Sequence, residues 1–578
     1  EGARLDGRFP NMGRTKMGVY LNGTSAYGLF REDFSLTYYV DKTEILAELA
    51  PLMELKADAD STEESFGGKG LKYVAITRPR RFGKTVMANM IASYFGKGVD
   101  SHTEFDTLKV SQYPWYKKHL NRHNVIHIVF NETPLNCRSY EAYIRMINNT
   151  LLDDLSMAYP DVKIRDTDSV WRVLTKIYEY CGGERFIFVL DEWDYIYHQD
   201  FATDGDKENF TRFLSNLLKV RAYVEMAYMT GILPIAKYSS GSELNMFCEY
   251  TMVTEEKYSA YFGFVDREVD DLYSRYLRQN PADRRITRAG LRAWYDGYHT
   301  KSGERVYNPR SVVLALENNN LGNYWTSSGP YDELFYYVGA NVDQVKDDVG
   351  LLLSDIPVPA KVQEYAATSM ELKTRDEIFS AMVVYGFLNY ENGCVSIPNR
   401  ELMDKFAEMA QKEGSLGNVY RLTRESGRML AATKAGDTKT MEAILQFVHN
   451  TESPLAVYNN EAELASILKL VYLQARDHYR IEREDKAGLG YVDFIFYPFV
   501  KNDDAIIIEL KVNHSAEEAI RQIKDRQYAL RFEGKLGERP AYTGRILAVG
   551  IAYHKGEGSR RHECRVEVLR GRIEGVGK

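Results

Sequence analysis

Short apolar runs alternate with amphipathic stretches over the first 255 residues of the chain. Four of these runs have the length and composition of buried strands: LKYVAIT (71–77), NVIHIVFN (124–131), RFIFVLD (185–191) and YVEMAYMTGI (223–232). Stretches between them, such as TVMANMIASYF (85–95), carry apolar residues at helical spacing. Strands that alternate with helices predict a parallel sheet covered by helices, and hence an α/β domain over 31–255.

The pattern changes on both sides of this domain. Residues 1–30 are rich in Gly, Asn, Arg and Ser without a clear period, which predicts a loosely ordered leader. Residues 256–450 are mostly helical in pattern, with turn residues at YDGYH (295–299). We divide this region into a helical lid over 256–335 and a helical connector over 336–450.

A second α/β pattern occupies residues 451–578. It begins with an amphipathic helix, EAELASILKLVYLQAR (461–476), and continues with a strand near RIERE and the apolar strands GYVDFIFY (490–497) and AIIIELKVN (505–513). A further helix, SAEEAIRQIKDRQYAL (515–530), precedes a last strand, RILAVGIAY (545–553). A helix, three strands, a second helix and a last strand, in this order, predict a separate small α/β domain at this end of the chain.

Composition is that of an ordinary soluble protein. The 578 residues exceed the size of one hydrophobic core, so several domains are expected. No apolar run approaches the ~20 residues that span a bilayer, which predicts no membrane partner. The first residues lack the apolar core of a secretory signal, and the five cysteines are scattered without a CxxC pair. We therefore expect a reducing, cytoplasmic location.

The net charge of −8 disfavours a protein that coats nucleic acid through bulk electrostatics. It leaves room for a locally basic groove, because binding depends on the distribution of charge more than on its sum.

The first candidate site lies at TRPRRFGKT (77–85), which follows a predicted strand and opens a predicted helix, as a phosphate-binding P-loop does. Gly83 allows a tight backbone turn, Lys84 can reach the β- and γ-phosphates, and Thr85 can ligate Mg²⁺. Arg80 and Arg81 place positive charge beside the phosphates. The P-loop consensus has glycine where this chain has Arg78, so a plain basic turn is the alternative.

An acidic strand end supplies the second half of this site. RFIFVLDEWD ends in Asp191 and Glu192, which in P-loop ATPases bind the Mg²⁺ ion and orient the attacking water. Thr230, at the end of the following strand, could sense the γ-phosphate. An acidic pair at the end of a buried strand is common by itself. The P-loop, the acidic strand end and the polar strand end occur in the order of an additional-strand ATPase core, which favours an ATP site.

The second candidate site lies on the strand AIIIELKVN. Side chains on a strand alternate faces, so Glu509 and Lys511 point the same way from an otherwise apolar segment. Burying two charges there is costly unless that face needs them. Asp493, sixteen residues earlier on the preceding strand, completes a D…E-x-K pattern. Asp493 and Glu509 can hold Mg²⁺ or Mn²⁺ at a phosphodiester, and Lys511 can orient water or neutralise developing charge.

Further side chains are candidates for this second site. Glu461 or Glu463, at the start of the preceding helix, could add a carboxylate. Gln522 and Tyr528 follow on the next helix with a spacing that commonly lines such sites. The alternative is a solvated, idle Glu–Lys pair. The upstream Asp493 and the helix–strand–strand–helix order favour the metal site.

The motifs of the chain, taken together, resemble the predicted AAA-ATPase-like family that is fused to a PD-(D/E)XK nuclease domain. The resemblance extends from about residue 30 to residue 555, and in this family the P-loop usually begins with Arg, as Arg78 does here. The motifs that carry it are YYVDKTEIL, RPRRFGKT, VLDEWD, MTG, FGFVDREV, WYDGYH, VYNPRS, NYWTSSG, IPNREL, YVDFIFY, IIIELKV and AIRQIKDRQY.

The resemblance implies a fold of several parts: a P-loop ATPase with a parallel sheet, a helical lid and connector, and a restriction-endonuclease-like α/β domain. It also implies an ATPase coupled to a metal-dependent nuclease, in phage defence or mobile-element biology. Lys84, Thr85, Asp191 and Glu192 carry over for the ATPase; Asp493, Glu509, Lys511 and, less directly, Gln522 carry over for the nuclease. One departure, TGILPIAKYSS, leaves open whether Lys237 acts as a sensor.

The sequence therefore predicts that ATP state gates metal-dependent cleavage of nucleic acid, DNA in preference to RNA. Two alternatives stay open. One is a nucleotide-dependent switch whose nuclease-fold domain binds nucleic acid without cutting it. The other is an ATPase whose nuclease domain serves assembly into a homo-oligomer.

Overall fold

The computed structural model of the chain describes residues 17–53, 72–235, 243–252, 256–325, 342–362, 374–450, 460–487, 490–533, 542–555 and 560–573. It divides into two compact units. The first comprises Glu1–Trp325, Val362–Glu371 and Ser380–Gly386, and the second comprises Thr326–Lys361, Leu372–Phe379 and Phe387–Lys578. Each described helix is too short or too polar to span a lipid bilayer.

A five-stranded parallel sheet forms the centre of the first unit. Its strands lie in the order β2-β3-β4-β1-β5. Because β1, β3 and nearly all of β4 are buried, their residues are apolar on both faces, as a parallel sheet covered by helices requires. The strands are β1 (Tyr73–Thr77), β2 (Asn124–Val129), β3 (Phe186–Asp191), β4 (Val224–Gly231) and β5 (Cys248–Thr251).

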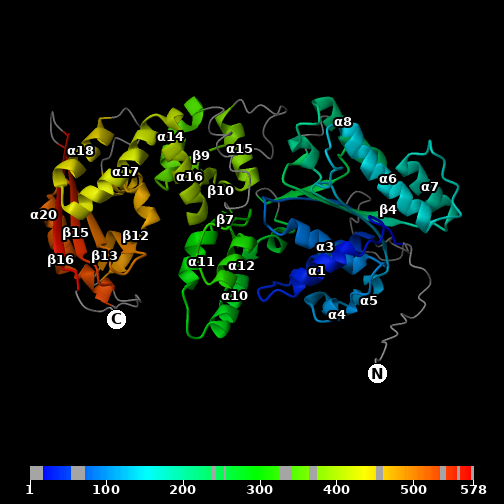
Figure 1. Cartoon of the computed structure of the whole chain (residues 1–578), viewed down its shortest axis with the longest axis horizontal. Coiled ribbons are helices and arrows are strands. Elements are labelled where there is room, and N and C mark those ends of the chain that lie inside the picture. The colour runs from blue at the N-terminus through cyan, green and yellow to red at the C-terminus, as the bar shows by residue number, and fades with distance from the viewer. Residues whose placement is uncertain are drawn as a thin grey trace, which may run out of the picture. The chain divides into compact units, whose positions relative to one another are not determined.

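Helices cover both faces of this sheet (Figure 1). On one face α1 (Ser25–Phe34) and α3 (Lys84–Phe95) bury their apolar sides against β1, β3 and β4. On the other face lie α6 (Tyr140–Ala158), α7 (Val170–Tyr180) and α8 (Asp204–Leu218). Three shorter helices complete this part: α2 (Ile45–Leu49), α4 (His102–Phe105) and α5 (Tyr116–His119).

The predicted loose leader is wrong for residues 17–30. The buried carboxylate of Asp154 on α6 accepts hydrogen bonds from the backbone N–H groups of Val19, Tyr20 and Leu21. Leu21 also pairs antiparallel with Ile126 of β2, and α1 begins four residues later. Local composition missed this segment because its hydrogen-bond partners lie more than a hundred residues away. Residues 1–16 lie outside the described residues.

The helical lid belongs, as far as Trp325, to the same unit as the parallel sheet. Helices α10 (Asp266–Gln279), α11 (Arg288–Tyr295) and α12 (Pro309–Asn318) pack around Tyr276 and Leu291. The sequence pattern missed a small sheet here. It consists of the short strands β6 (Phe264–Val265), β8 (Arg305–Tyr307) and β7 (Tyr298–His299), in that order.

Most of the helical connector belongs to the second unit. The predicted hairpin is present as β10 (Asn389–Glu391) and β11 (Cys394–Ser396), which pair antiparallel, with β9 (Val358–Pro359) beside β11. The helices of this region are α14 (Val342–Leu353), α15 (Arg375–Tyr385), α16 (Arg400–Lys412), α17 (Asn418–Ala435) and α18 (Thr438–His449). Of α15, only the first half belongs to this unit.

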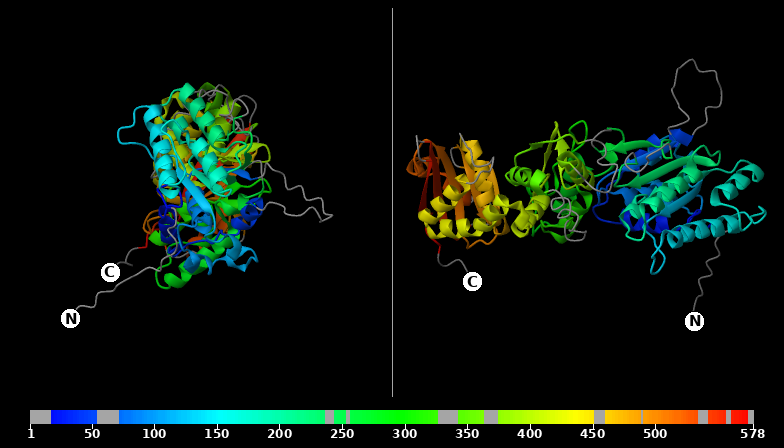
Figure 2. Two further views of the ribbon diagram at one scale, coloured as in Figure 1. Left: turned by 90° about the vertical axis from the view of Figure 1, so that its right-hand side faces the viewer. Right: turned by 90° about the horizontal axis from the view of Figure 1, so that it is seen from above.

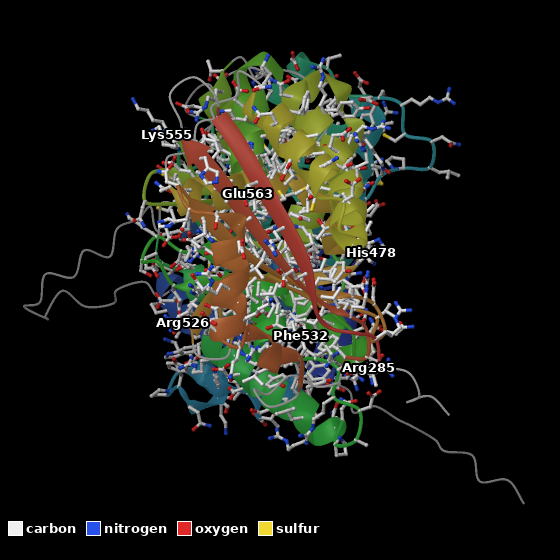
Figure 3. All side chains as sticks on the ribbon, turned by 90° about the vertical axis from the view of Figure 1, so that its left-hand side faces the viewer. Arg285, His478, Arg526, Phe532, Lys555 and Glu563 are labelled. Atoms are coloured by element: carbon white, nitrogen blue, oxygen red, sulfur yellow. The ribbon has the colours of Figure 1, made fainter. Side chains whose placement is uncertain are left out.

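The second unit ends in a five-stranded mixed sheet, ordered β12-β13-β14-β15-β16. All neighbours are antiparallel except β14 and β15. The strands are β12 (Tyr479–Ala487), β13 (Gly490–Pro498), β14 (Ala505–Val512), β15 (Ile546–Lys555) and β16 (Arg560–Arg570). Figure 2 shows these strands as one layer, and Figure 3 looks onto the edge strand β16, on which Glu563 lies.

Helices cover this sheet as well. On one face α20 (Ala516–Asp525) packs Ile520 and Ile523 against β13, β14 and β15. Helices α18 and α19 (Glu461–Val471) cover the other face. These two sheets, with the helical regions, confirm the predicted multidomain α/β fold class.

Candidate functional sites

The P-loop backbone connects the end of β1 to the start of α3. Gly83 precedes the first residue of α3 with a φ of 86°, and Arg81 has a φ of 69°. Glycine adopts such angles without strain, whereas Arg81 does so at a cost of about 1–3 kcal/mol. When left-handed residues alternate with other residues in a loop, successive backbone N–H groups point to the same side. This is the geometry of an anion-binding nest. The N-terminus of the twelve-residue helix α3 adds its dipole to this site.

Lys84 lies beneath the loop and is 8% exposed. Its ammonium donates to the carbonyl oxygens of Arg78 (2.9 Å) and Pro79 (2.8 Å). Burial lowers the pKa of Lys84 to about 8, although Asp194, Asp191 and Glu192 oppose this shift. The side chain of the next residue, Thr85, is exposed. Lys84 is therefore held inside the loop by backbone carbonyls and surrounded by acidic charge.

Arg78 has a structural place in the loop. It is 1% exposed and donates to the carbonyl oxygens of Thr77 and Tyr250, both at 2.8 Å. Its guanidinium carbon lies 5.2 Å from the centre of the Phe262 ring. Burial lowers the pKa of Arg78 to about 10. The side chain ties the loop to the edge strand β5, which accounts for arginine where the P-loop consensus has glycine.

The arginines in the middle of the loop meet the helical lid. Arg81 donates from one guanidinium nitrogen to the carbonyl oxygens of Tyr324 (3.0 Å) and Trp325 (2.7 Å). The indole nitrogen of Trp325 in turn donates to the carbonyl oxygen of Arg80 at 3.2 Å. Phe82 packs edge-on against Tyr298. The structure thus turns Arg81 toward the lid, whereas the sequence suggested a phosphate contact.

The acidic strand end lies at the carboxyl end of β3. Asp191 is fully buried, and its Oδ1 accepts hydrogen bonds from the Thr230 hydroxyl (2.8 Å) and the Glu192 N–H (3.0 Å). Its Oδ2 has no hydrogen-bond partner among the described residues. Glu192 follows with a φ of 54°, and burial together with Asp191 raises its pKa. A buried carboxylate oxygen in need of a partner fits a divalent cation.

Asp194 is a residue of this site to which the sequence assigned no role. Its Oδ2 accepts hydrogen bonds from the N–H groups of Ile232 (3.0 Å) and Leu233 (2.9 Å). Burial alone would raise the pKa of Asp194, but His198 and these two N–H donors lower it overall. Asp194 therefore fixes the chain just after Thr230. The second aspartate of the sequence DEWD was the available signal.

The second site lies where the C-terminal sheet forks. The ladder between β13 and β14 joins only 494–496 with 506–508. Beyond it, β13 stays paired with β12 as far as Gly490, and β14 stays paired with β15 as far as Val512. Asp493 and Glu509 lie at the opening of this fork. The N–H of Leu510 donates to Asp493 Oδ2 at 2.8 Å instead of to a strand partner.

Charged side chains converge at the fork. Glu509 is 3% exposed, and its Oε1 accepts hydrogen bonds from Lys511 Nζ (3.3 Å) and from the Gln522 amide. Lys511 Nζ also lies 3.6 Å from Glu461 Oε1. Glu463 instead contacts the helix-capping residue Asn460, so Glu461 is the residue of this pair that faces the site. Glu509 Oε2 has no hydrogen-bond partner within the described part of the chain.

The electrostatics of this fork favour a cation. Burial, followed by the charge of Asp493, raises the pKa of Glu509 to about 7, against the opposing effect of Lys511. Burial also raises the pKa of Asp493. Within the described residues no group of three or more His, Cys, Asp or Glu is placed to hold a metal. The site offers two carboxylates, and a hard cation that takes its remaining oxygen ligands from water and phosphate fits that set.

Gly550 allows α20 to reach this fork. It lies beside Glu509 on β15, and a Cβ atom there would lie 2.2 Å from the Ala516 carbonyl oxygen of α20. Because this position carries no side chain, α20 packs close enough for Gln522 to contact Glu509. The sequence reasoning missed Gly550, although a lone glycine within an apolar strand is a known signal of close approach.

The structure brings most of the predicted residues together. At the carboxyl ends of the central strands of the first sheet lie Lys84, Asp191, Glu192 and Thr230. At the fork of the second sheet lie Asp493, Glu509, Lys511 and Gln522. Lys237 lies outside the described residues.

Two parts of the chain match known families. Residues 68–240 match the AAA-ATPase-like family model, described as a predicted AAA-ATPase. Residues 459–563 match the model of the PD-(D/E)XK nuclease superfamily. These matches confirm the predicted resemblance.

A curated protein of Azotobacter chroococcum, described as an uncharacterized protein in the vnfD 5' region, is 26% identical over 329 residues. The match covers 55% of each chain, so this chain spans about half the length of that relative.

Three solved structures, each 10% identical in sequence, are also similar. The Walker-type ATPase PABY2304 of Pyrococcus abyssi aligns with 61% of this chain and 99% of its own at a TM-score of 0.33. Cdc6p from Pyrobaculum aerophilum aligns with 59% and 88% at 0.24. The ORC2 protein of Aeropyrum pernix aligns with 71% and 97% at 0.30.

Proposed function

We propose that this chain, which carries a predicted AAA-ATPase domain and a PD-(D/E)XK nuclease superfamily domain, is an ATP-hydrolysing protein that cuts nucleic acid with a divalent metal. The proposed domains are 31–255 for the ATPase, 256–335 for the lid, 336–450 for the connector and 451–578 for the nuclease. The observation that carries the nuclease assignment is the buried Glu509, with one oxygen lacking a partner, beside Asp493 and Lys511.

Asp493 and Glu509 would hold Mg²⁺ or Mn²⁺, which supplies an activated water and neutralises charge on the phosphate. The protein's own contribution is positional. Gln522 fixes the orientation of the Glu509 carboxylate, and the Leu510 N–H fixes that of Asp493. Lys511 presents an ammonium at the same edge, where it would stabilise the negative charge that develops on the phosphate oxygens.

The ATPase assignment is supported by the loop and its acidic neighbours. The left-handed residues Arg81 and Gly83 and the start of α3 would bind phosphate oxygens through backbone N–H groups. Lys84 would exchange its backbone carbonyl partners for the β- and γ-phosphates. Asp191 and Thr85 would hold Mg²⁺, and Glu192 would orient the attacking water.

The contacts of Arg81 support a role for the lid in sensing nucleotide. Arg81 connects the phosphate-binding loop to the carbonyl groups of Tyr324 and Trp325. Phosphate bound in this loop would therefore change contacts that reach the lid. We propose that the nucleotide state in this way gates access of nucleic acid, DNA in preference to RNA, to Glu509. A cytoplasmic place in phage defence or mobile-element biology is part of the same proposal.

A cleavage panel tests this function. The purified protein is incubated with single- and double-stranded DNA and RNA, with Mg²⁺ or Mn²⁺, and with or without ATP. Cleavage that needs metal and changes with ATP is the expected result. Metal-independent binding without cleavage would instead identify a nucleotide-dependent switch, and a mass that follows ATP but not metal would identify an assembly role.

A further inference from the structure

An exposed aromatic ring lies beside the nuclease site without a role in the core. Tyr491 is the second residue of β13, and 68% of it is exposed. Residues further along this strand, such as Ile495 and Tyr497, are buried against α20. A single exposed ring is common on protein surfaces, so the position of Tyr491 relative to the candidate site decides whether it has a role.

The strand geometry places Tyr491 next to the reacting centre. Tyr491 and Asp493 are two residues apart on β13, so their side chains leave the same face of the sheet about 7 Å apart. Asp493 in turn accepts a hydrogen bond from the Leu510 N–H of the neighbouring strand β14, next to Glu509, at the opening of the fork. A nucleotide whose phosphate lies against Asp493 and Glu509 would have its base within reach of the Tyr491 ring.

The backbone of Tyr491 is anchored although its ring is exposed. The hydroxyl of Tyr528, a residue that is 1% exposed, donates to the Tyr491 carbonyl oxygen at 2.6 Å. Tyr528 follows closely after Gln522, which contacts Glu509. The same segment therefore contacts both the Glu509 carboxylate and the backbone of the strand position that carries the ring.

We propose that Tyr491 is a stacking platform for an unpaired nucleobase next to the scissile phosphate. The inference rests on the proposed nuclease function and deepens it. A base can lie flat on the ring only after leaving its own stack, so the platform selects single-stranded or locally unpaired nucleic acid. Stacking of this kind tolerates any base, because every base has an aromatic face.

Binding by a cleavage-deficient protein tests the platform. In an E509Q background, Tyr491→Ala should weaken the binding of single-stranded oligonucleotide about 5- to 150-fold, whereas Tyr491→Phe and Tyr491→Trp should retain it. The matched control is Phe499→Ala, which removes a ring that is 54% exposed just beyond the other end of β13. This control should leave binding unchanged. Equal losses for Tyr491→Ala and Phe499→Ala would overturn the inference.

A second arm removes the base instead of the ring. Oligonucleotides with a single abasic site at successive positions are bound to the E509Q protein with and without Tyr491→Ala. At one position next to the cleaved bond the abasic substrate should erase the penalty of the Ala substitution. A penalty that persists at every position would contradict stacking.

Cleavage kinetics separate this inference from the proposed function. Tyr491→Ala in the active protein should raise KM for single strands and leave kcat within about twofold, since the ring holds substrate without touching the reacting atoms. Cleavage that survives Glu509→Ala would remove the proposed nuclease site. Loss of cleavage in Glu509→Ala, together with unchanged binding in Tyr491→Ala, would remove only the platform.

Discussion

The two candidate sites arrange their charged side chains in different ways. Each has a buried carboxylate with one oxygen lacking a partner among the described residues, Asp191 in the first and Glu509 in the second. Each also has a lysine close by. Lys84 donates to backbone carbonyls of its own loop, whereas Lys511 pairs directly with the carboxylates of Glu509 and Glu461.

This difference shows which atoms each site depends on. In the proposed function the P-loop would bind phosphate largely through backbone N–H groups, and two of its arginine side chains contact other parts of the chain: Arg78 reaches β5 and Arg81 reaches the lid. At the fork the side chains themselves form the site. We therefore expect single substitutions to be more damaging at the fork than at the P-loop.

The largest effect is expected at the fork. Glu509→Gln and Asp493→Asn should each lower metal-dependent cleavage at least about a thousandfold, because each removes a metal-binding charge while keeping the shape of the side chain. Gel-based cleavage assays at saturating Mg²⁺ measure this loss. ATP binding by both variants should match that of the wild type, and a parallel loss of ATP binding would indicate general misfolding.

A pH effect on stability should follow from Glu509. Its pKa rises from 4.5 to about 7 on folding, so between these values the folded protein holds a proton that the unfolded chain has released. Stability without metal should therefore fall as pH rises from 4.5 to 7, by up to about 3 kcal/mol. Unfolding midpoints of the wild type and the E509Q variant at pH 5 and pH 7.5 measure the difference. Equal pH slopes for the two proteins would contradict the buried, protonated carboxyl.

A smaller effect is expected at the P-loop. Lys84→Ala should weaken ATP binding about 10- to 100-fold, the value of a charge-assisted hydrogen bond to phosphate. Titration with a fluorescent ATP analogue measures the change. Lys97→Ala, which removes a lysine just beyond the far end of α3, serves as the control and should bind ATP normally.

The smallest effect is expected for Thr230→Val. The variant loses the hydrogen bond to Asp191 Oδ1 but keeps the volume of the side chain, so ATP hydrolysis should fall about tenfold with little change in ATP binding. Thr211→Val on α8, away from the P-loop, removes a comparable buried hydrogen bond to the Tyr197 hydroxyl and serves as the control. If the two variants lose the same stability and the same hydrolysis, Thr230 has no special place in the site.

The parts of the molecule that the sequence predicted are those with local signals. Apolar runs identified the strands β1 to β4, and the i, i+2 spacing of Glu509 and Lys511 identified a shared face. What remained hidden depends on contacts between distant segments. The carbonyl groups of Tyr324 and Trp325 that accept hydrogen bonds from Arg81, and the close approach of α20 over Gly550, leave no periodic pattern in the sequence.

Residues 19–21, whose backbone N–H groups donate to Asp154, affect the tendency of the protein to aggregate. The strand β2 lies at the edge of the parallel sheet, where unpaired N–H and C=O groups could pair with another chain. Backbone hydrogen bonds join Tyr20 to His127 and Asn22 to Val125, so the segment covers part of that edge. A protein shortened to begin at α1 would expose this edge and its buried neighbour Ile126. Such a protein should self-associate, although both candidate sites would be intact.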